Sequence, residues 1–518
     1  MRRTKESGIE GQERAPVDGS SLPRAKREAT LTRKVARGGA IALAGQGLTR
    51  IVSFCLQLIL SNALGMKVYG VYSLAVNLVE WAQQISLLGL TNGLVRFSSA
   101  YIAEGSRQRV RDATISAGAV SLVASLLGVG LLLSTSGPLA EALFHDPSFA
   151  PHLRWLSLSV PVLVSLSLLQ ALMRGLQRID KMVALGLARS LIYLALVGLL
   201  AKVGLDLGGV IAAFIAGALA PVFLGLITLR RMGWKILGGR PSLVRDLLAF
   251  SIPIFVATLS QLVVARLDLL ILGYFYGAQS AGLYRAAVTV ASMVNFILGA
   301  MNTAFAPMIA ELHHLDRRGE LESMYKTVTR WILMVAVPVC SLVLILSKDL
   351  LGLFGKGFEE AYVALGILSI SQLCNAATGS VGFMLQMTGK EKWFLFNYVV
   401  SAILNVSLNL LLVPSLGVTG AAIATGASVV LVNGLGSAEL WFSQRIHPWS
   451  KWCASSVAAA GVSALGGVLM QLILGNWIVT ASTVTLAYLF MVFTVAAPRE
   501  DRDLFIHFLS RARMKIKN

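Results

Sequence analysis

Charged side chains stand inside long apolar stretches of this sequence, where they could hold a charged ligand. Arg266 and Asp268 lie within the nearly uncharged run that begins at Leu247, and Arg285 opens the next apolar run. Burying a charge at the depth of a lipid bilayer is costly, so each such residue indicates a functional site or an ion pair. The element that must position these charges is a membrane hairpin.

Counting from the turn of that hairpin predicts which charges pair. With the turn centred near Gly277, Asp268 lies nine residues before it and Arg285 eight residues after it. At about 1.5 Å per helical residue they lie at similar depth, so we expect an ion pair between them. Arg266 is rotated by roughly 200° from Asp268 around the helix and is expected to face another cavity or helix.

The same hairpin occurs earlier in the chain. Identical residues recur at one separation of 212 positions at both ends of a block, which indicates two homologous halves of six spans each. In the first copy, Arg50 and Glu80 lie fifteen residues either side of Gly65 and could pair across their hairpin. The matches join Gly65, Gly70, Tyr72, Ala75, Gly208, Ile211 and Ala212 to Gly277, Gly282, Tyr284, Ala287, Gly420, Ile423 and Ala424.

The composition indicates a polytopic membrane protein. Of 518 residues, 56% are hydrophobic and only 14% are charged, too few to cover a soluble protein of this size. The sequence predicts an all-α fold with 14 transmembrane helices, each long enough to cross about 30 Å of hydrocarbon. The runs are 38–63, 71–93, 113–136, 155–173, 183–201, 207–229, 246–274, 283–310, 331–347, 361–387, 394–413, 418–441, 452–474 and 477–497.

The distribution of positive charge predicts the orientation. Of the 45 Lys and Arg residues, 36 fall on the side of the N-terminus, five in the opposite loops and four within spans. This asymmetry follows the positive-inside rule, so the net charge of +19 does not call for nucleic acid. It places both termini in the cytoplasm, and we expect the inner (cytoplasmic) membrane of the cell.

The predicted segments follow from the spans and the charge runs. The basic N-terminal tail should lie against anionic headgroups, and the C-terminal tail should lie along the cytoplasmic interface. The segments are a basic cytoplasmic tail (1–37), an N-lobe of spans 1–6 (38–229), a cytoplasmic linker (230–245), a C-lobe of spans 7–12 (246–441), spans 13–14 (452–497) and an interfacial cytoplasmic tail (498–518).

Other polar residues within the spans have two interpretations each. Arg189 could snorkel to the cytoplasmic side or face a central cavity. Glu80 and Gln84, one turn apart, could form a hydrated wall or join helices. Amides in apolar helices could meet carbohydrate hydroxyls or neighbouring helices. The candidate glycan contacts are Gln46, Gln84, Asn295, Gln372, Asn397 and Asn405.

The sequence lacks the usual signatures of an enzyme or a metal site. It has no HExxH, no GxxxxGK[ST], no paired acids at a loop mouth and no CxxC among its four cysteines. Outer loops of at most eighteen residues leave little room for a catalytic face. We therefore expect no catalytic residues, no metal and no cofactor, with a membrane-embedded glycan polymerase or ligase as the less favoured alternative.

Several motifs carry a family resemblance. They are the Gly65–Tyr72 segment, Arg266-Leu-Asp268 followed by Gly273, the Gly282-Leu-Tyr284 turn, Pro307, and the Asn-rich segment from Asn405 to Ala424. Through these the chain resembles bacterial polysaccharide flippases (Wzx-like) of the multidrug, oligosaccharidyl-lipid and polysaccharide exporter superfamily. The similarity spans nearly everything from about residue 31 to residue 497.

The resemblance implies two six-helix lobes forming a V about a central cavity. It also implies alternating access and the flipping of an isoprenoid-diphosphate-linked oligosaccharide to the outer face for cell-surface polysaccharide biosynthesis, with membrane lipids and polysaccharide-assembly proteins as further partners. A cation-coupled multidrug exporter of the same fold is the alternative, although such a pump would require an acidic, aromatic-lined cavity.

The charges within the spans predict the residue roles. Four arginines against two acids leave a positive surplus, which suits a diphosphate because guanidinium groups make forked contacts with phosphate oxygens. Arg50 and Arg266 are the first candidates for substrate binding, followed by Arg189 and Arg285. Glu80 and Asp268 are expected to orient arginines or to bind a coupling H⁺ or Na⁺.

Overall fold

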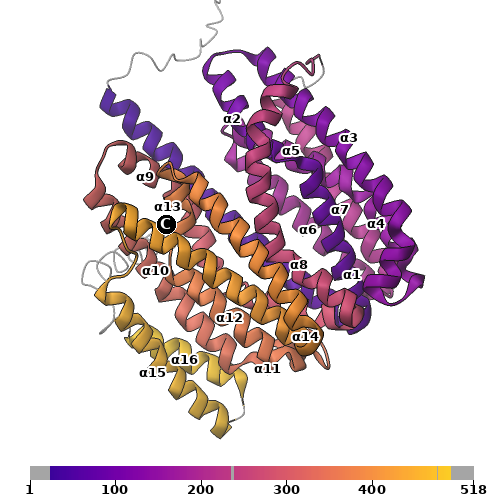
Figure 1. Cartoon of the computed structure of the whole chain (residues 1–518), viewed down its shortest axis with the longest axis vertical. Helices are drawn as coiled ribbons and strands as arrows, with labels where there is room; N and C mark the ends of the chain where they lie inside the picture. The colour runs from indigo at the N-terminus through magenta and orange to yellow at the C-terminus, as the bar shows by residue number, and fades with distance from the viewer. Residues whose placement is uncertain (1–23, 235–237, 475, 492–518) are drawn as a thin grey trace, which may run out of the picture.

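The computed structural model describes residues 24–234, 238–474 and 476–491, and every regular element in these ranges is helical (Figure 1). The all-α prediction is confirmed. The helices are α1 (Arg24–Leu87), α2 (Leu90–Ala103), α3 (Arg107–Leu139), η2 (Ala140–Phe144), η3 (Pro147–Phe149), α4 (Ala150–Ser157), α5 (Ser159–Gly175), α6 (Ile179–Val203), α7 (Leu207–Arg231), α8 (Val244–Ala291), α9 (Phe296–His314), α10 (Arg318–Ile345), α11 (Ser347–Gly352), η4 (Phe358–Ala361), α12 (Tyr362–Ala377), α13 (Val381–Met387), α14 (Glu391–Gln444), α15 (Lys451–Leu474) and α16 (Trp477–Met491).

The chain is a multi-span membrane protein. Nine helices in the described ranges are long and apolar enough to cross a membrane, or ten if Phe358–Ala377 and Val381–Met387, which meet at a bend of 41°, form one span. Some of these helices are bent and hold more than one crossing, since the 54 residues of α14 would extend about 81 Å if straight. The number of fourteen spans stays a prediction.

Glycines bend the three longest helices. Gly65 in α1 (φ 71°, ψ 168°), Gly277 in α8 (φ 74°, ψ −173°) and Gly417 in α14 (φ 54°, ψ −129°) have backbone angles that residues with a Cβ rarely adopt. The chain folds back at each of the first two. Tyr69 donates a hydrogen bond to Gln57 across Gly65, and Tyr284 donates one to Asp268 across Gly277. The hairpins predicted at Gly65 and Gly277 are confirmed.

The two hairpins pack against each other through glycines that correspond in the sequence repeat. A Cβ on Gly70 would overlap the carbonyl oxygen of Ala278, and a Cβ on Gly282 would lie 2.7 Å from the carbonyl oxygen of Met66. Gly70 and Gly282 are 212 residues apart, so equivalent residues meet, as a local pseudo-twofold axis requires. We call this end of the molecule, which holds Gly65 and Gly277, the bend end.

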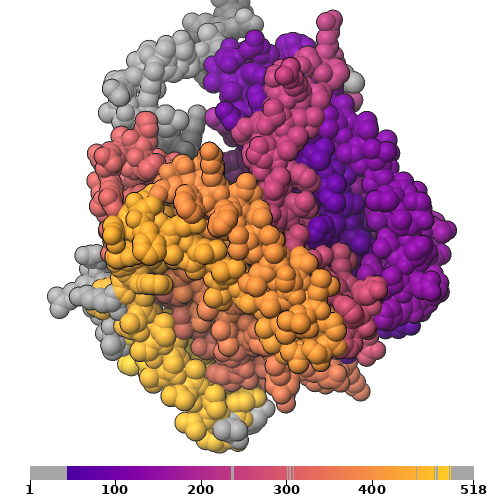
Figure 2. All heavy atoms as spheres, viewed as in Figure 1, coloured from indigo at the N-terminus to yellow at the C-terminus, as the bar shows by residue number. Residues whose placement is uncertain are grey.

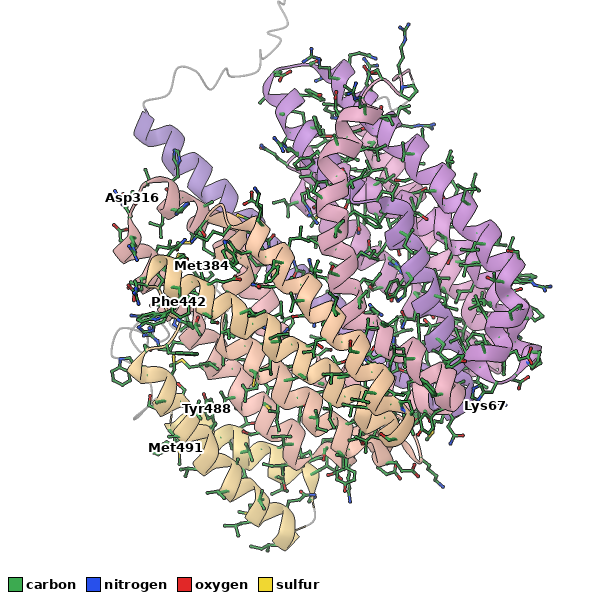
Figure 3. The ribbon with its side chains drawn as sticks, in the orientation of Figure 1. Lys67, Asp316, Met384, Phe442, Tyr488 and Met491 are labelled. Carbon is green, nitrogen blue, oxygen red and sulfur yellow. The ribbon has the colours of Figure 1, made fainter. Side chains whose placement is uncertain are left out.

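The helices form two groups that diverge away from the bend end (Figure 1). One group contains α2 to α7 and the other α9 to α14, while α8 packs against α1 and α2 on one side and α14 on the other. Figure 2 shows a notch between the groups at the end near α2 and α9. In Figure 3, Lys67 marks the bend end and Asp316 the opposite end.

The pair α15 and α16 packs on the outside of the second group, against α10 (Figure 1). Cys453 and Tyr488 bury their side chains beside Leu333 and Val337 of α10. The pair therefore lies away from the space between the groups.

The predicted tails and linker are described only in part. The chain is helical from Arg24, so residues 24–37 of the predicted tail begin α1. Residues 1–23 of that tail, the tail 498–518 and residues 235–237 of the linker lie outside the described residues. The rest of the linker contacts α3, where the Asp112 carboxylate accepts a hydrogen bond from the Arg240 backbone N–H at 2.8 Å.

Candidate functional site

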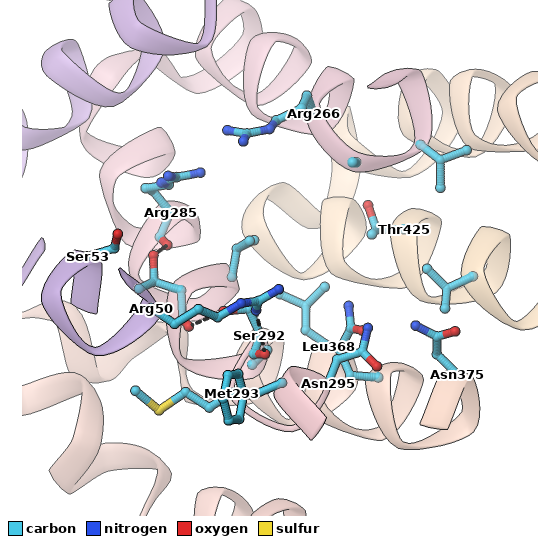
Figure 4. Close-up of a pocket in the computed structure, with 18 of the residues that line it drawn as sticks. Arg50, Ser53, Arg266, Arg285, Ser292, Met293, Asn295, Leu368, Asn375 and Thr425 are labelled. Atoms are coloured by element: carbon cyan, nitrogen blue, oxygen red, sulfur yellow. Dashed lines mark hydrogen bonds between the residues drawn. The ribbon is translucent and has the colours of Figure 1, made fainter. Parts of the chain in front are cut away.

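A cavity of about 1000 Å³ lies between α1, α8, α12 and α14 (Figure 4). Its charged lining consists of Arg50, Arg266, Arg285 and Asp268. The bends at Gly65 and Gly277 fold α1 and α8 back on themselves, and the segment after α8 adds Ser292 and Asn295 to the wall. Three of the four arginines predicted for substrate binding thus share one cavity.

Arg50 is exposed in this cavity and forms no ion pair among the described residues. Its Nη1 donates to the carbonyl oxygen of Ser292 at 3.4 Å (Figure 4). The predicted Arg50–Glu80 pair is wrong. The returning arm of α1 faces α8, as the hydrogen bond from Asn77 to the Arg266 carbonyl oxygen shows, so Glu80 points to a different helix.

Glu80 instead pairs with Arg266. Their Oε2 and Nη1 atoms are 2.5 Å apart, and the side chains are 28% and 30% exposed. Arg266 thus contacts another helix, as its position predicts, but it lines the same cavity as Asp268 and not another one. Its positive charge is offset by Glu80, which leaves Arg50 and Arg285 as the cavity arginines without a carboxylate partner in the described structure.

Asp268 is buried and does not pair with Arg285, so that prediction is wrong. The carboxylate accepts hydrogen bonds from the Tyr284 hydroxyl, from Thr425 Oγ1 at 2.8 Å and from the Leu269 backbone N–H at 2.7 Å. Adjacent helix residues are about 100° apart. Since Tyr284 takes the face toward Asp268, Arg285 points elsewhere into the cavity.

Arg189 does not line the cavity. Its guanidinium lies over the Phe214 ring of α7, 5.5 Å from the ring centroid. Its place among the substrate-binding candidates therefore has no support from the cavity geometry.

The six amide residues predicted as glycan contacts lie in different places. Asn295 and Gln372 line the large cavity, and Asn295 and Asn397 line a smaller adjoining pocket. Asn405 is fully buried and accepts a hydrogen bond from Asn409 at 3.1 Å inside α14. Gln46 and Gln84 line neither space.

Sequence reasoning missed several polar residues of the site. Thr425, the second hydroxyl on Asp268, lies in a stretch of small residues, where nothing distinguishes it from a packing residue. Gln386 and Asn433 stand alone in apolar runs, the same signal that identified Gln372. No cluster of three or more metal-binding side chains occurs in the part of the chain that the structure describes.

The bent helices, the V-shaped pair of groups and the basic cavity define a multi-span protein with the fold of the multidrug, oligosaccharidyl-lipid and polysaccharide exporter superfamily. The lipid II flippase MurJ in an inward closed conformation superposes with a TM-score of 0.70 at 12% identity, covering 87% of this chain and 98% of MurJ. An inward-facing multidrug resistance MATE family transporter gives 0.62 at 16% identity, covering 79% and 98%. Identities this low show the shared fold.

The chain belongs to the polysaccharide biosynthesis protein family, whose profile matches residues 35–313. The MatE profile matches residues 253–411. Among named relatives, the probable flippase AglR of Haloferax volcanii is 24% identical over 443 residues, covering 83% of this chain and 89% of AglR. The probable low-salt glycan biosynthesis flippase Agl15 of the same organism is 24% identical over 351 residues, covering 64% and 73%.

Proposed function

We propose that this protein flips an isoprenoid-diphosphate-linked oligosaccharide from the cytoplasmic to the outer face of the membrane for cell-surface polysaccharide biosynthesis. The two helix groups rock about the packed hairpins, so that the cavity opens to one side of the membrane at a time. Membership of the polysaccharide biosynthesis protein family and relatives named as flippases support this proposal.

The observation that carries the proposal is the charge of the cavity. Arg50 and Arg285 face the same space of about 1000 Å³ without a carboxylate partner in the described structure. A diphosphate supplies the negative charge and the oxygen acceptors that two guanidinium groups require. Arg266, paired with Glu80, lines the same cavity.

Asp268 is proposed as the coupling site for H⁺ or Na⁺. Its carboxylate is buried at the cavity wall and is surrounded by the hydroxyls of Tyr284 and Thr425. Hard cations prefer such oxygen ligands, and a proton would convert the carboxylate from an acceptor to a donor. Either ion would alter the contacts between α8 and α14.

The membrane setting is part of the same proposal. The 36 to 5 distribution of Lys and Arg favours the cytoplasmic membrane with both termini inside the cell. The six-span lobes at 38–229 and 246–441 act as the moving bodies. Polysaccharide-assembly proteins supply the substrate and receive it after it has crossed. The protein performs no covalent chemistry on it.

The MATE-like fold keeps a cation-coupled drug exporter as the second candidate. An exporter of organic cations needs acidic side chains free to meet its substrate. Here Glu80 is paired with Arg266 and Asp268 accepts three hydrogen bonds. The basic cavity therefore favours the anionic lipid-linked substrate.

The test is transbilayer movement of a fluorescent isoprenoid-diphosphate oligosaccharide in reconstituted vesicles. We expect Arg50→Ala and Arg285→Ala each to slow movement by about tenfold to a hundredfold, the effect of losing a charge-assisted contact of about 1.5–3 kcal/mol. Arg189→Gln is the matched control, because this arginine lies within a span but outside the cavity.

Full movement in both cavity variants, at equal amounts of folded protein, would remove the diphosphate assignment. Export of organic cations by the native protein, without movement of the lipid-linked glycan, would establish the drug-exporter alternative instead.

A further inference from the structure

A second pocket of about 370 Å³ adjoins the large cavity on the side away from the bend end. The two spaces share Arg50, Asn295 and Asn375 in their walls, so a ligand can extend from one into the other. The second pocket also reaches Asn302 of α9 and Gln386 of α13. Its volume falls in the range of about 300–1,000 Å³ that small-molecule sites occupy. We call it the amide pocket.

Side-chain amides dominate the polar lining of the amide pocket. They include Asn295, Asn302, Gln386 and Asn397, which come from three different helices and from the segment before α9. The lining contains no carboxylate, and Arg50 at the boundary with the large cavity is its single charged residue. An amide both donates and accepts hydrogen bonds, so this lining suits neutral groups that do the same.

Several of these polar atoms have no protein partner. The Oδ1 atoms of Asn295, Asn302 and Asn397 and the Oγ of Ser380 are buried without a hydrogen bond in the described structure. Asn397 is nevertheless held in place, because its Nδ2 donates to Glu439 Oε2 at 2.8 Å. Buried polar groups are almost always satisfied, so these oxygens lack the donors that such groups normally have.

Aromatic rings complete the wall. Phe394 and Tyr398 both line the pocket and lie with ring centroids 4.8 Å apart. Gly382 makes room for Phe394, since a Cβ there would lie 3.2 Å from the ring. The helix breaks between α12 and α13, with Gly379 (φ +60°) at the break, and residues of this break also line the pocket.

We propose that the amide pocket binds the uncharged sugars next to the diphosphate, while the large cavity holds the diphosphate itself. This assignment rests on the proposed function. Sugar hydroxyls exchange hydrogen bonds with the side-chain amides that line the pocket, and the apolar face of a sugar ring packs on the aromatic wall. The pocket lacks the additional positive charges that an acidic sugar would need, so the proposal specifies a neutral reducing end of the glycan.

The assignment is tested by protection of single cysteines from a maleimide. Ser292→Cys reports the large cavity beside Arg50, and Gln386→Cys reports the amide pocket, each in a chain whose exposed Cys55 and Cys374 are replaced by serine. The probes are an isoprenoid diphosphate carrying a neutral disaccharide and the same lipid without sugar. We expect both lipids to protect Ser292→Cys and the disaccharide lipid alone to protect Gln386→Cys.

Equal protection of Gln386→Cys by both lipids, or by neither, would overturn the glycan assignment while leaving the diphosphate site intact. Loss of protection at Ser292→Cys with both lipids would show instead that the proposed function fails, and the glycan assignment with it. A disaccharide containing a uronic acid that protects Gln386→Cys as well as the neutral one would also contradict the proposal.

A transport measurement gives a second readout. Asn302→Ala should slow movement of the disaccharide lipid by about three- to tenfold, the effect of one neutral hydrogen bond, and leave movement of the sugar-free lipid unchanged. The control is Asn92→Ala, because Asn92 is exposed on α2 and lines neither space. An equal loss with both lipids in Asn302→Ala would assign this residue a structural role and count against the glycan site.

Discussion

The partner of each charged side chain decides which arginines can meet a ligand. Arg266 and Arg285 both lie on α8 and both line the cavity, yet among the described residues only Arg266 has a carboxylate within contact distance. A partly buried ion pair is costly to break from one side, because the remaining charge loses its partner. Arg266 therefore stays with Glu80, which leaves Arg50 and Arg285 for the proposed contact with the diphosphate.

At the same scale, Asp268→Asn tests ion coupling. The amide keeps most of the shape and the contact with Thr425 while removing the charge that would bind Na⁺ or a proton. We expect movement of the lipid-linked glycan to lose its dependence on an imposed Na⁺ or pH gradient. Flux is measured in vesicles with and without each gradient.

Thr425→Val provides the comparison, because it removes one hydroxyl and keeps the carboxylate. It should weaken the gradient dependence without abolishing it. Gradient-driven movement that persists in Asp268→Asn would place the coupling site elsewhere.

A loop residue near the bend end gives a pH prediction. Hydrogen bonds from Ser148 and the ammonium of Lys67, 3.1 Å away, lower the pKa of Asp146 from its usual 3.8. Its contribution to stability is therefore present above about pH 3.8 and is lost as the pH falls through the lowered pKa. The difference in melting temperature between the native protein and Asp146→Asn should shrink over that acid range.

The effect is small, because the pair is exposed. Lys67→Met should reproduce part of the difference above pH 3.8. A difference that stays constant down to the most acidic pH would rule out Asp146 as the titrating group.

The sequence identified the cavity charges but not their partners. Counting residues from Gly277 gives the depth of Asp268 and Arg285 and says nothing of their direction around each helix. Tyr284, one residue before Arg285, takes the position that the count assigned to the arginine. The contact between Glu80 and Arg266 joins two hairpins, and a count within one hairpin cannot predict it.

At the scale of elements, substitutions of glycines at the bends and in their packing should lower the stability of the protein by graded amounts. Gly65→Ala adds a methyl group that touches nothing within 4 Å, so its effect is backbone strain alone, about 1–3 kcal/mol at such angles. Gly70→Ala should destabilise more, because the methyl group would overlap the Ala278 carbonyl oxygen. Thermal unfolding in detergent measures both effects.

Gly118→Ala is the control for that series. It lies inside α3 with no atom within 4 Å of the added methyl group, and alanine is favoured over glycine in a helix by about 0.5–1 kcal/mol. A loss of stability in Gly118→Ala equal to that in Gly70→Ala would contradict the close packing of the hairpins.

Apolar runs predicted most helices but hid their breaks. The predicted span 71–93 contains the end of α1 and the start of α2, and the predicted span 361–387 contains the break between α12 and α13. Composition does not change at these breaks. The break between α1 and α2 is set by packing, since a Cβ on Gly89 would lie 2.5 Å from the Ser251 carbonyl oxygen of α8. These two residues are far apart in the sequence, so the apolar pattern does not reveal their contact.

At the scale of the whole molecule, contacts at the bend end oppose the opening at the other end. There, the Gly70–Gly282 packing joins α1 to α8, and a hydrogen bond of 2.6 Å from Asn62 to the Leu353 carbonyl oxygen joins α1 to the segment after α11. The notch lies at the end near α2 and α9 (Figure 2). Alternating access requires these bend-end contacts to separate in the opposite state.

That requirement can be tested by locking the bend end. Asn62→Cys combined with Leu353→Cys places two accessible thiols at a contact between α1 and the segment after α11, in a chain without Cys55 and Cys374. A short bifunctional maleimide should stop movement of the lipid-linked glycan while leaving substrate protection of the large cavity intact, because neither Asn62 nor Leu353 lines that cavity. Each single-cysteine variant treated in the same way controls for modification without cross-linking. Undiminished movement in the fully cross-linked protein would mean that the substrate crosses without separation of the bend end. That result would contradict transport by rocking of the two groups.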